Sequence, residues 1–175
     1  LHRRAPAGRL RSRRPEVGPA AGTVKPLRLV AALALAGLSA FAEPAPRWYE
    51  GNLHTHSLWS DGNDYPEMIV DWYARHGYQF LALSDHNTLS QGERWFDLSQ
   101  ANKRAGQDGF ARYKTRFGAD WVETRSVDGK LQVRLKPLSE YRALFERPGE
   151  FLLIQGEEIT DHFEKKPIHM NASNV

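Results

Sequence analysis

Residues 80–86 read Phe80-Leu81-Ala82-Leu83-Ser84-Asp85-His86, an apolar run that ends on a serine, an aspartate and a histidine. An unbroken apolar run of this length is typical of a strand that is buried on both faces of a parallel sheet. Before it, residues 65–76 place apolar side chains at helical spacing, and Gly77 is positioned to end that helix. The sequence therefore predicts a helix followed by a buried strand whose carboxyl end carries Asp85 and His86.

Further strands are predicted on either side of this unit. Residues 48–56 form an extended stretch, and residues 138–147 form a helix that ends at Pro148-Gly149. Residues 151–154 form a second buried strand that delivers Gly156-Glu157-Glu158, and residues 168–170 form a brief fourth strand. Strands that alternate with helices predict the α/β fold class with a mainly parallel sheet. In such folds, functional side chains gather at the carboxyl ends of the strands.

The middle of the chain, residues 91–136, is polar and lacks this rhythm. Residues 121–125 and 131–135 have alternating faces and are separated by a turn at Asp128-Gly129, so they predict a β-hairpin. We interpret the segment as an insertion beside the functional site. It forms either a lid or substrate wall, or an inert surface excursion.

The first part of the chain differs in composition from the rest. Residues 24–42 combine a basic start, a 14-residue apolar run over residues 29–42 and a small-x-small site at Ala40-Phe41-Ala42. These are the features of a secretory signal peptide. The run is shorter than the roughly 20 residues of a spanning helix, so a retained membrane anchor is the less favoured alternative. We expect residues 1–23 to be untranslated or disordered upstream sequence, and the mature protein to be secreted or periplasmic without a membrane segment.

The charge of the mature part does not favour nucleic-acid binding. Residues 1–42 contain eight basic residues and one acidic residue, which leaves 16 basic and 20 acidic residues for the rest of the chain. The basic pI of the whole chain therefore belongs to the leader, and the body is acidic. The chain contains no cysteine, so a metal site must use nitrogen and oxygen ligands, which suit Zn, Mn, Fe or Mg.

Two histidines in a His-x-His pattern introduce the candidate metal site. His54 and His56 point to the same side of an extended strand, because side chains alternate with period two. Each of the other polar clusters also follows a predicted strand, and together they give six predicted metal ligands: His54, His56, Asp61, His86, Glu158 and His169. A carboxylate at the centre of such a cluster can bridge two ions about 3.5–4 Å apart. Glu158 suits this role because it follows a buried strand, whereas Glu157 points the opposite way.

The remaining candidates have supporting or unrelated roles. We predict that Glu158 and His86 act directly in catalysis, and that Asp85 is an outer-shell carboxylate that orients a ligand. His76 is expected to pack or to cap a helix, and His162 is expected to be a solvated histidine of a polar loop.

Four stretches of the chain resemble a known family. His54-Thr55-His56 with Ser60-Asp61-Gly62, residues 83–88, residues 156–160 and Pro167-Ile168-His169 are similar to the first four motifs of the PHP domain, named after polymerase and histidinol phosphatase. The resemblance implies a distorted (β/α)7 barrel that holds two or three divalent ions, Zn, Mn or Fe. It also implies that His54, His56 and Glu158 bind one ion, Glu158 and His169 a second, and Asp61 and His86 a third.

The family pattern continues with another histidine and a late Asp-x-His, and this chain reaches Val175 before either. We therefore expect residues 47–175 to form an incomplete, N-terminal portion of the barrel, with a β-hairpin insertion.

Three functions follow as expectations. The first is a histidinol-phosphatase-like phosphoesterase that hydrolyses a small-molecule phosphate ester with a metal-activated water. The second is a hydrolase of carboxylic or carbamate esters, because secreted relatives of the carbaryl-hydrolase type have a similar opening motif. The third is a metal-binding or partner-binding module without turnover.

Overall fold

The structure is a computed structural model that describes residues 45–175. The expected upstream segment (1–23) and signal peptide (24–42) lie outside the described residues. Residues 47–175 form one unit of mixed α/β structure, with four helices among the described residues. In this part of the chain, no helix has the length and apolar character needed to cross a membrane.

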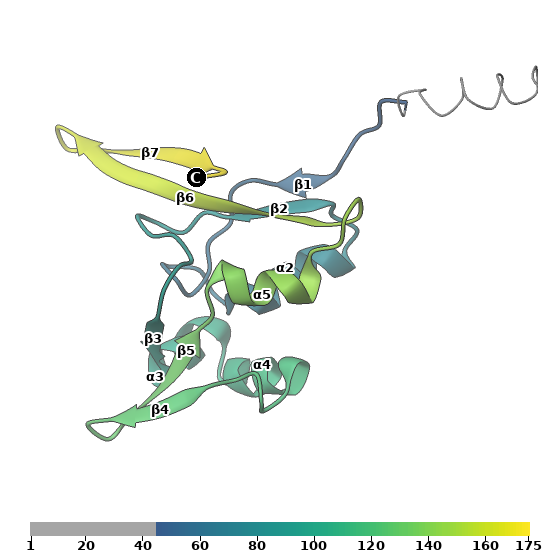
Figure 1. Ribbon diagram of the computed structural model, residues 1–175. Coiled ribbons are helices and arrows are strands. Elements are labelled where there is room, and N and C mark those ends of the chain that lie inside the picture. The colour runs from purple at the N-terminus through teal and green to yellow at the C-terminus, as the bar shows by residue number, and fades with distance from the viewer. Residues whose placement is uncertain (1–44) are drawn as a thin grey trace, which may run out of the picture. The chain divides into compact units, whose positions relative to one another are not determined.

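The main sheet has the strand order β1-β2-β6-β7 (Figure 1). Its strands are β1 (Gly51–Asn52), β2 (Phe80–Leu83), β6 (Leu152–Phe163) and β7 (Lys166–Ser173). β1 and β6 both pair with β2 in parallel. The predicted strand over residues 80–83 is therefore confirmed, and its last three residues are buried as the apolar run predicted. β1 is much shorter than the extended stretch expected over residues 48–56.

Helices α2 (Pro66–Arg75) and α5 (Leu138–Phe145) contact each other and pack on β2 and β6 respectively (Figure 1). Both helices were predicted, and both end within two residues of the expected positions. α2 ends because Gly77 takes a φ of +85°, a left-handed conformation that costs glycine little. His76 caps this end through its backbone N–H and stacks on Trp72, which confirms its predicted capping role.

The apolar faces of α2, α5 and the sheet form one core. Its buried members are Val70, Leu81, Leu83, Leu138, Tyr141, Phe145, Phe151 and Leu153. Burying several large aliphatic and aromatic side chains, each worth about 1.5–3 kcal/mol, stabilises the strands that end at the candidate site.

Strand β6 is longer than the sequence predicted. It continues past Glu158 and forms an antiparallel hairpin with β7, drawn in yellow in Figure 1. One expectation is therefore wrong: His162 lies in a strand and not in a loop. His169 lies in a strand as expected, and this strand, β7, is longer than the predicted residues 168–170 and antiparallel to β6. The hairpin closes through residues 164–165, where Glu164 takes a φ of +56°. Neither residue is a typical left-handed turn former, so the turn was not visible in the sequence.

The insertion over residues 91–136 is more than a hairpin. It contains β3 (Arg94–Asp97), α3 (Leu98–Ala105), α4 (Gly109–Phe117), β4 (Thr124–Val127) and β5 (Lys130–Leu135), with the strand order β3-β5-β4. The predicted β4–β5 hairpin is confirmed with slightly shifted bounds, while β3 and both helices were missed. The insertion shares a core with Leu58, Trp59 and Tyr65, so it supports the loop that carries Asp61.

Candidate metal centre

The structure brings all six predicted ligands together. They fall into three groups whose ligand atoms lie within 4.8 Å of one another: His54, His56 and Glu158; His56, Asp61 and His86; and His86, Glu158 and His169. The segment after β1 carries His54, His56 and Asp61, and the segment after β2 carries His86. Glu158 and His169 lie on the two strands of the β6–β7 hairpin. These groups of imidazoles and carboxylates are positioned to hold a divalent metal ion.

Glu158 lies at the centre of the cluster and is almost fully buried. Its Oε2 atom lies 2.7 Å from His56 Nε2, 3.3 Å from His54 Nε2 and 3.2 Å from His86 Nδ1. Its Oε1 atom lies 2.9 Å from His169 Nδ1. The two carboxylate oxygens therefore face different sets of imidazoles, which is the arrangement that a bridging carboxylate needs.

The surroundings of Glu158 fit a metal better than a hydrogen-bond network. Oε2 is buried and accepts no hydrogen bond, although three imidazole nitrogens surround it at short range. A buried carboxylate oxygen without a partner costs about 1–3 kcal/mol or more. A divalent cation held between this oxygen and the imidazole lone pairs would offset that cost, so the residues fit the group that the sequence predicts.

Asp61 connects two of the histidines. Its Oδ1 lies 2.8 Å from His56 Nδ1 and its Oδ2 lies 3.5 Å from His86 Nε2. Burial raises the pKa of Asp61, but the hydrogen bond from His56 and the nearby imidazole charges outweigh it and lower the pKa overall. A neutral imidazole has one lone pair. If the lone pair of His56 is on Nε2 and faces Glu158, the hydrogen is on Nδ1 and can be donated to Asp61. Asp61 then orients the His56 ring and also pairs with His86.

Asp85 does not contact His86 through its side chain. Its carboxylate accepts hydrogen bonds from the backbone N–H of Ser57 at 2.7 Å and from the hydroxyls of Ser57 and Ser60 at 2.8 and 2.6 Å. These contacts fix the loop that leads from His56 to Asp61. Asp85 is therefore placed to orient the loop that carries Asp61. Its position next to His86 in the sequence could not show which ligand it orients.

The other candidates lie where the alternation of β6 places them. Glu158 is buried and Glu157 is only partly buried, as expected for opposite side-chain directions. His162 is exposed and belongs to none of the metal-type groups of the described residues.

Sequence reasoning missed two residues beside the centre, Thr160 and Asn87. Both stand inside the quoted motifs, but only their hydrogen bonds across strands reveal their positions.

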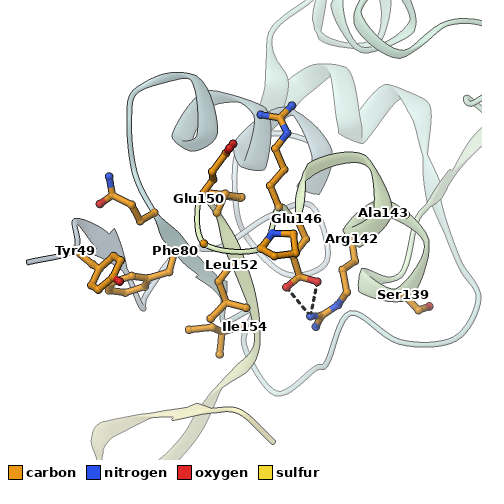
Figure 2. Close-up of a pocket in the computed structure, with 14 residues that line it drawn as sticks. Tyr49, Phe80, Ser139, Arg142, Ala143, Glu146, Glu150, Leu152 and Ile154 are labelled. Carbon is orange, nitrogen blue, oxygen red and sulfur yellow. Dashed lines mark hydrogen bonds and ion pairs between the residues drawn. The ribbon is translucent and has the colours of Figure 1, made fainter. Parts of the chain in front are cut away.

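A cavity of about 980 Å³ does not belong to this centre, because its wall contains none of the six predicted ligands. Figure 2 shows its wall, which includes Phe80 and Leu152 and the ion pair between Arg142 and Glu146. Phe80 and Leu152 begin β2 and β6, so this cavity lies at the opposite ends of the strands from the metal ligands. A smaller cavity of about 470 Å³ includes His56 in its wall and so adjoins the centre.

Comparison with models of known protein families returned no match. Comparisons with curated proteins and with solved structures returned no match either.

Proposed function

We propose that this chain is a metal-dependent hydrolase of the PHP type that cleaves phosphate esters. One observation carries most of the proposal: the buried Oε2 of Glu158 has three imidazole nitrogens within 3.3 Å and accepts no hydrogen bond. Bound divalent ions would polarise a phosphoryl oxygen and lower the pKa of a water molecule toward neutrality. The donor set contains only nitrogen and oxygen, which favours Zn, Mn or Fe, and the three residue groups allow two or three ions.

The chain's own residues would hold and orient these ions. Glu158 presents one oxygen to His54 and His56 and the other to His169, so it can join two neighbouring ions. Asp61 and His86 provide a further carboxylate–imidazole pair beside them.

A positive side chain at the loop that carries Asp61 favours an anionic substrate. Arg104 of α3 donates a hydrogen bond to the backbone oxygen of Ser60, the residue directly before Asp61. This contact places a guanidinium group beside the loop that carries Asp61, where its field attracts phosphate oxygens. It also gives the insertion a part in the proposed site.

We also propose that the main sheet is part of a distorted (β/α)7 barrel. The parallel strands β1, β2 and β6 lie side by side in the sheet in the order in which they occur along the chain, and α2 connects the first two. This succession of strand, helix and parallel strand is the repeating unit of such barrels.

A carboxylic or carbamate ester is the second candidate substrate. The cavity beside His56 is lined partly by Met68, Ile69 and Trp72, so an apolar acyl or alcohol group fits its wall. The same ions that act on a phosphoryl group can polarise a carbonyl group.

The experiment that tests the proposal is hydrolysis of p-nitrophenyl phosphate and p-nitrophenyl acetate by the chain with added Mn²⁺ or Zn²⁺. We expect phosphate release that EDTA abolishes and added metal restores. Cleavage of the acetate alone would favour the second candidate. Stoichiometric metal binding without cleavage of either ester would overturn hydrolysis and leave a binding module.

A further inference from the structure

Thr160 lies between two of the candidate metal ligands. Its Oγ1 atom is 2.7 Å from His86 Nδ1 and 3.2 Å from His169 Nδ1. Thr160 faces the centre because it lies two residues after Glu158 on β6 and pairs with His169 across the hairpin. The backbone oxygen of Glu158 is also within 3.4 Å of the hydroxyl.

The backbone of Thr160 is held in place by Asn87. The Asn87 side-chain oxygen accepts the Thr160 N–H at 2.8 Å, and its side-chain nitrogen donates to the Thr160 carbonyl at 3.2 Å. The Asn87 backbone N–H also donates to the Glu158 carbonyl at 3.0 Å. Asn87 has a φ of +47°, a conformation that asparagine tolerates better than most residues. The segment that carries His86 is thus tied to the strand that carries Glu158.

The hydrogen bond between Thr160 and His86 bears on which nitrogen of His86 is free. Each ring nitrogen of His86 lies near a different carboxylate. Nε2 lies 3.5 Å from Asp61 Oδ2, and Nδ1 lies 3.2 Å from Glu158 Oε2. A neutral imidazole carries one N–H and one lone pair, and a threonine hydroxyl has two lone pairs to accept with. When Nδ1–H donates to Thr160, the lone pair of His86 is on Nε2 and faces Asp61.

We infer that Thr160, held in place by Asn87, is a positioning residue that fixes the tautomer of His86. The lone pair on Nε2 then faces Asp61, and Nδ1 is not available as a ligand to the group with Glu158 and His169. Glu158 and His169 then act together without His86. Hydrogen-bond partners of this kind fix the orientation of metal-binding histidines, and their loss typically weakens metal binding 10–100-fold. The inference deepens the proposed function and rests on the same metal centre.

The test compares Thr160→Val, Thr160→Ser and Asn87→Gly with the wild-type chain by Zn²⁺ titration calorimetry. Valine keeps the shape and strand preference of threonine but lacks the hydroxyl. We expect Thr160→Val to weaken part of the Zn²⁺ binding by about 10–100-fold. Thr160→Ser should bind nearly as the wild type does, and Asn87→Gly should fall between the two. Thr124→Val, an exposed position of β4, is the matched control and should bind like the wild type.

A spectroscopic measurement tests the same inference by reading the His86 ring directly. Long-range ¹H–¹⁵N correlation spectra of the Zn²⁺-loaded protein with ¹⁵N-labelled histidine report which ring nitrogen carries the hydrogen. We expect the hydrogen of His86 on Nδ1 in the wild type, and a change at His86 in Thr160→Val. The opposite tautomer in the wild type, or wild-type affinity and an unchanged His86 in Thr160→Val, would overturn the inference.

The inference and the proposed function fail in different ways. A wild-type chain that binds Zn²⁺ through His86 Nε2 but cleaves no ester overturns only hydrolysis. An active chain in which Thr160→Val binds Zn²⁺ like the wild type overturns only the role of Thr160. No Zn²⁺ binding by the wild type overturns both.

Discussion

The Nε2 atom of His56 lies 2.7 Å from the Oε2 atom of Glu158, so the segment after β1 meets the middle of β6 at this pair. His54 joins the same oxygen from 3.3 Å because it lies two residues earlier on an extended chain. The two histidines and the glutamate thus converge from distant parts of the sequence.

Replacing His56 with alanine should remove bound metal and activity together, because it takes one imidazole from the group around Glu158. We expect the metal affinity to fall by at least the 10–100-fold that loss of an outer-shell partner causes. Metal content by mass spectrometry and the phosphate ester assay check this. His162→Ala is the control, because His162 is an exposed residue of the same strand outside the metal-type groups. An equally damaging His162→Ala would show that the ligand assignment is wrong.

Asp85→Asn should destabilise the fold and the loop before Asp61. The Asp85 carboxylate accepts three hydrogen bonds, one of them from the backbone of Ser57. An asparagine must turn a donor toward at least one of these groups. We expect unfolding free energy to fall by about 2–3 kcal/mol in urea titrations. Asp128→Asn, in the exposed β4–β5 turn, should change it by less than about 0.5 kcal/mol. Equal stabilities of the two variants would contradict this role of Asp85.

Gly62→Ala should disturb the path from His56 to Asp61. A Cβ atom at Gly62 would lie 2.4 Å from the backbone carbon and oxygen of His56. Because these are backbone atoms, the loop must move and Asp61 must move with it. We expect weaker Zn²⁺ binding and a stability loss of about 1–3 kcal/mol.

Gly118→Ala separates this effect from ordinary backbone strain. Gly118 has a φ of +89° and open space around its Cβ position, so alanine should cost about 1–2 kcal/mol without affecting metal binding. Unchanged Zn²⁺ affinity in Gly62→Ala would mean that the loop does not position Asp61.

Glu67 connects α2 to the insertion and should make stability depend on pH. Its Oε1 accepts hydrogen bonds from Tyr113 at 2.7 Å and from Trp121 at 2.9 Å. Burial raises the pKa of Glu67 from 4.5 to about 7, although the hydrogen bonds and Lys136 oppose the shift. Between these two values the folded state binds more protons than the unfolded state, so this group makes stability fall as pH rises.

Glu67→Gln should remove that pH dependence, because the amide keeps an acceptor for Tyr113 and Trp121 but has no charge to bury. The variant and the wild type should be equally stable near pH 4. At pH 8 the variant should be more stable by roughly 3 kcal/mol. Urea titrations at both pH values check this, and a stability difference that does not change with pH would contradict it.

The parts of the fold that were predicted have strong local signals. The β2 strand has an unbroken apolar run, and α2 has apolar spacing, Pro66 in its first turn and Gly77 after its end. The six candidate ligands could be picked out because each stands beside a predicted strand.

The missed elements depend on contacts between distant residues. β3 is a strand because it pairs with β5, which no local pattern shows. α3 and α4 are short and mostly polar, so each offers only a few apolar side chains as a signal. Some local signals were nevertheless present: Asp97 caps α3, and Gly106 and Gly118 follow the two helices. The burial of Glu67 could not be predicted, because the insertion that covers it folds back from far along the chain.

The most direct test of the metal centre is an anomalous difference map from crystals of the chain grown with Zn²⁺. The account predicts one peak between His54, His56 and Glu158, and at least one more, beside Glu158 and His169 or beside Asp61 and His86. Well-ordered side chains at these positions without an anomalous peak among them would contradict it.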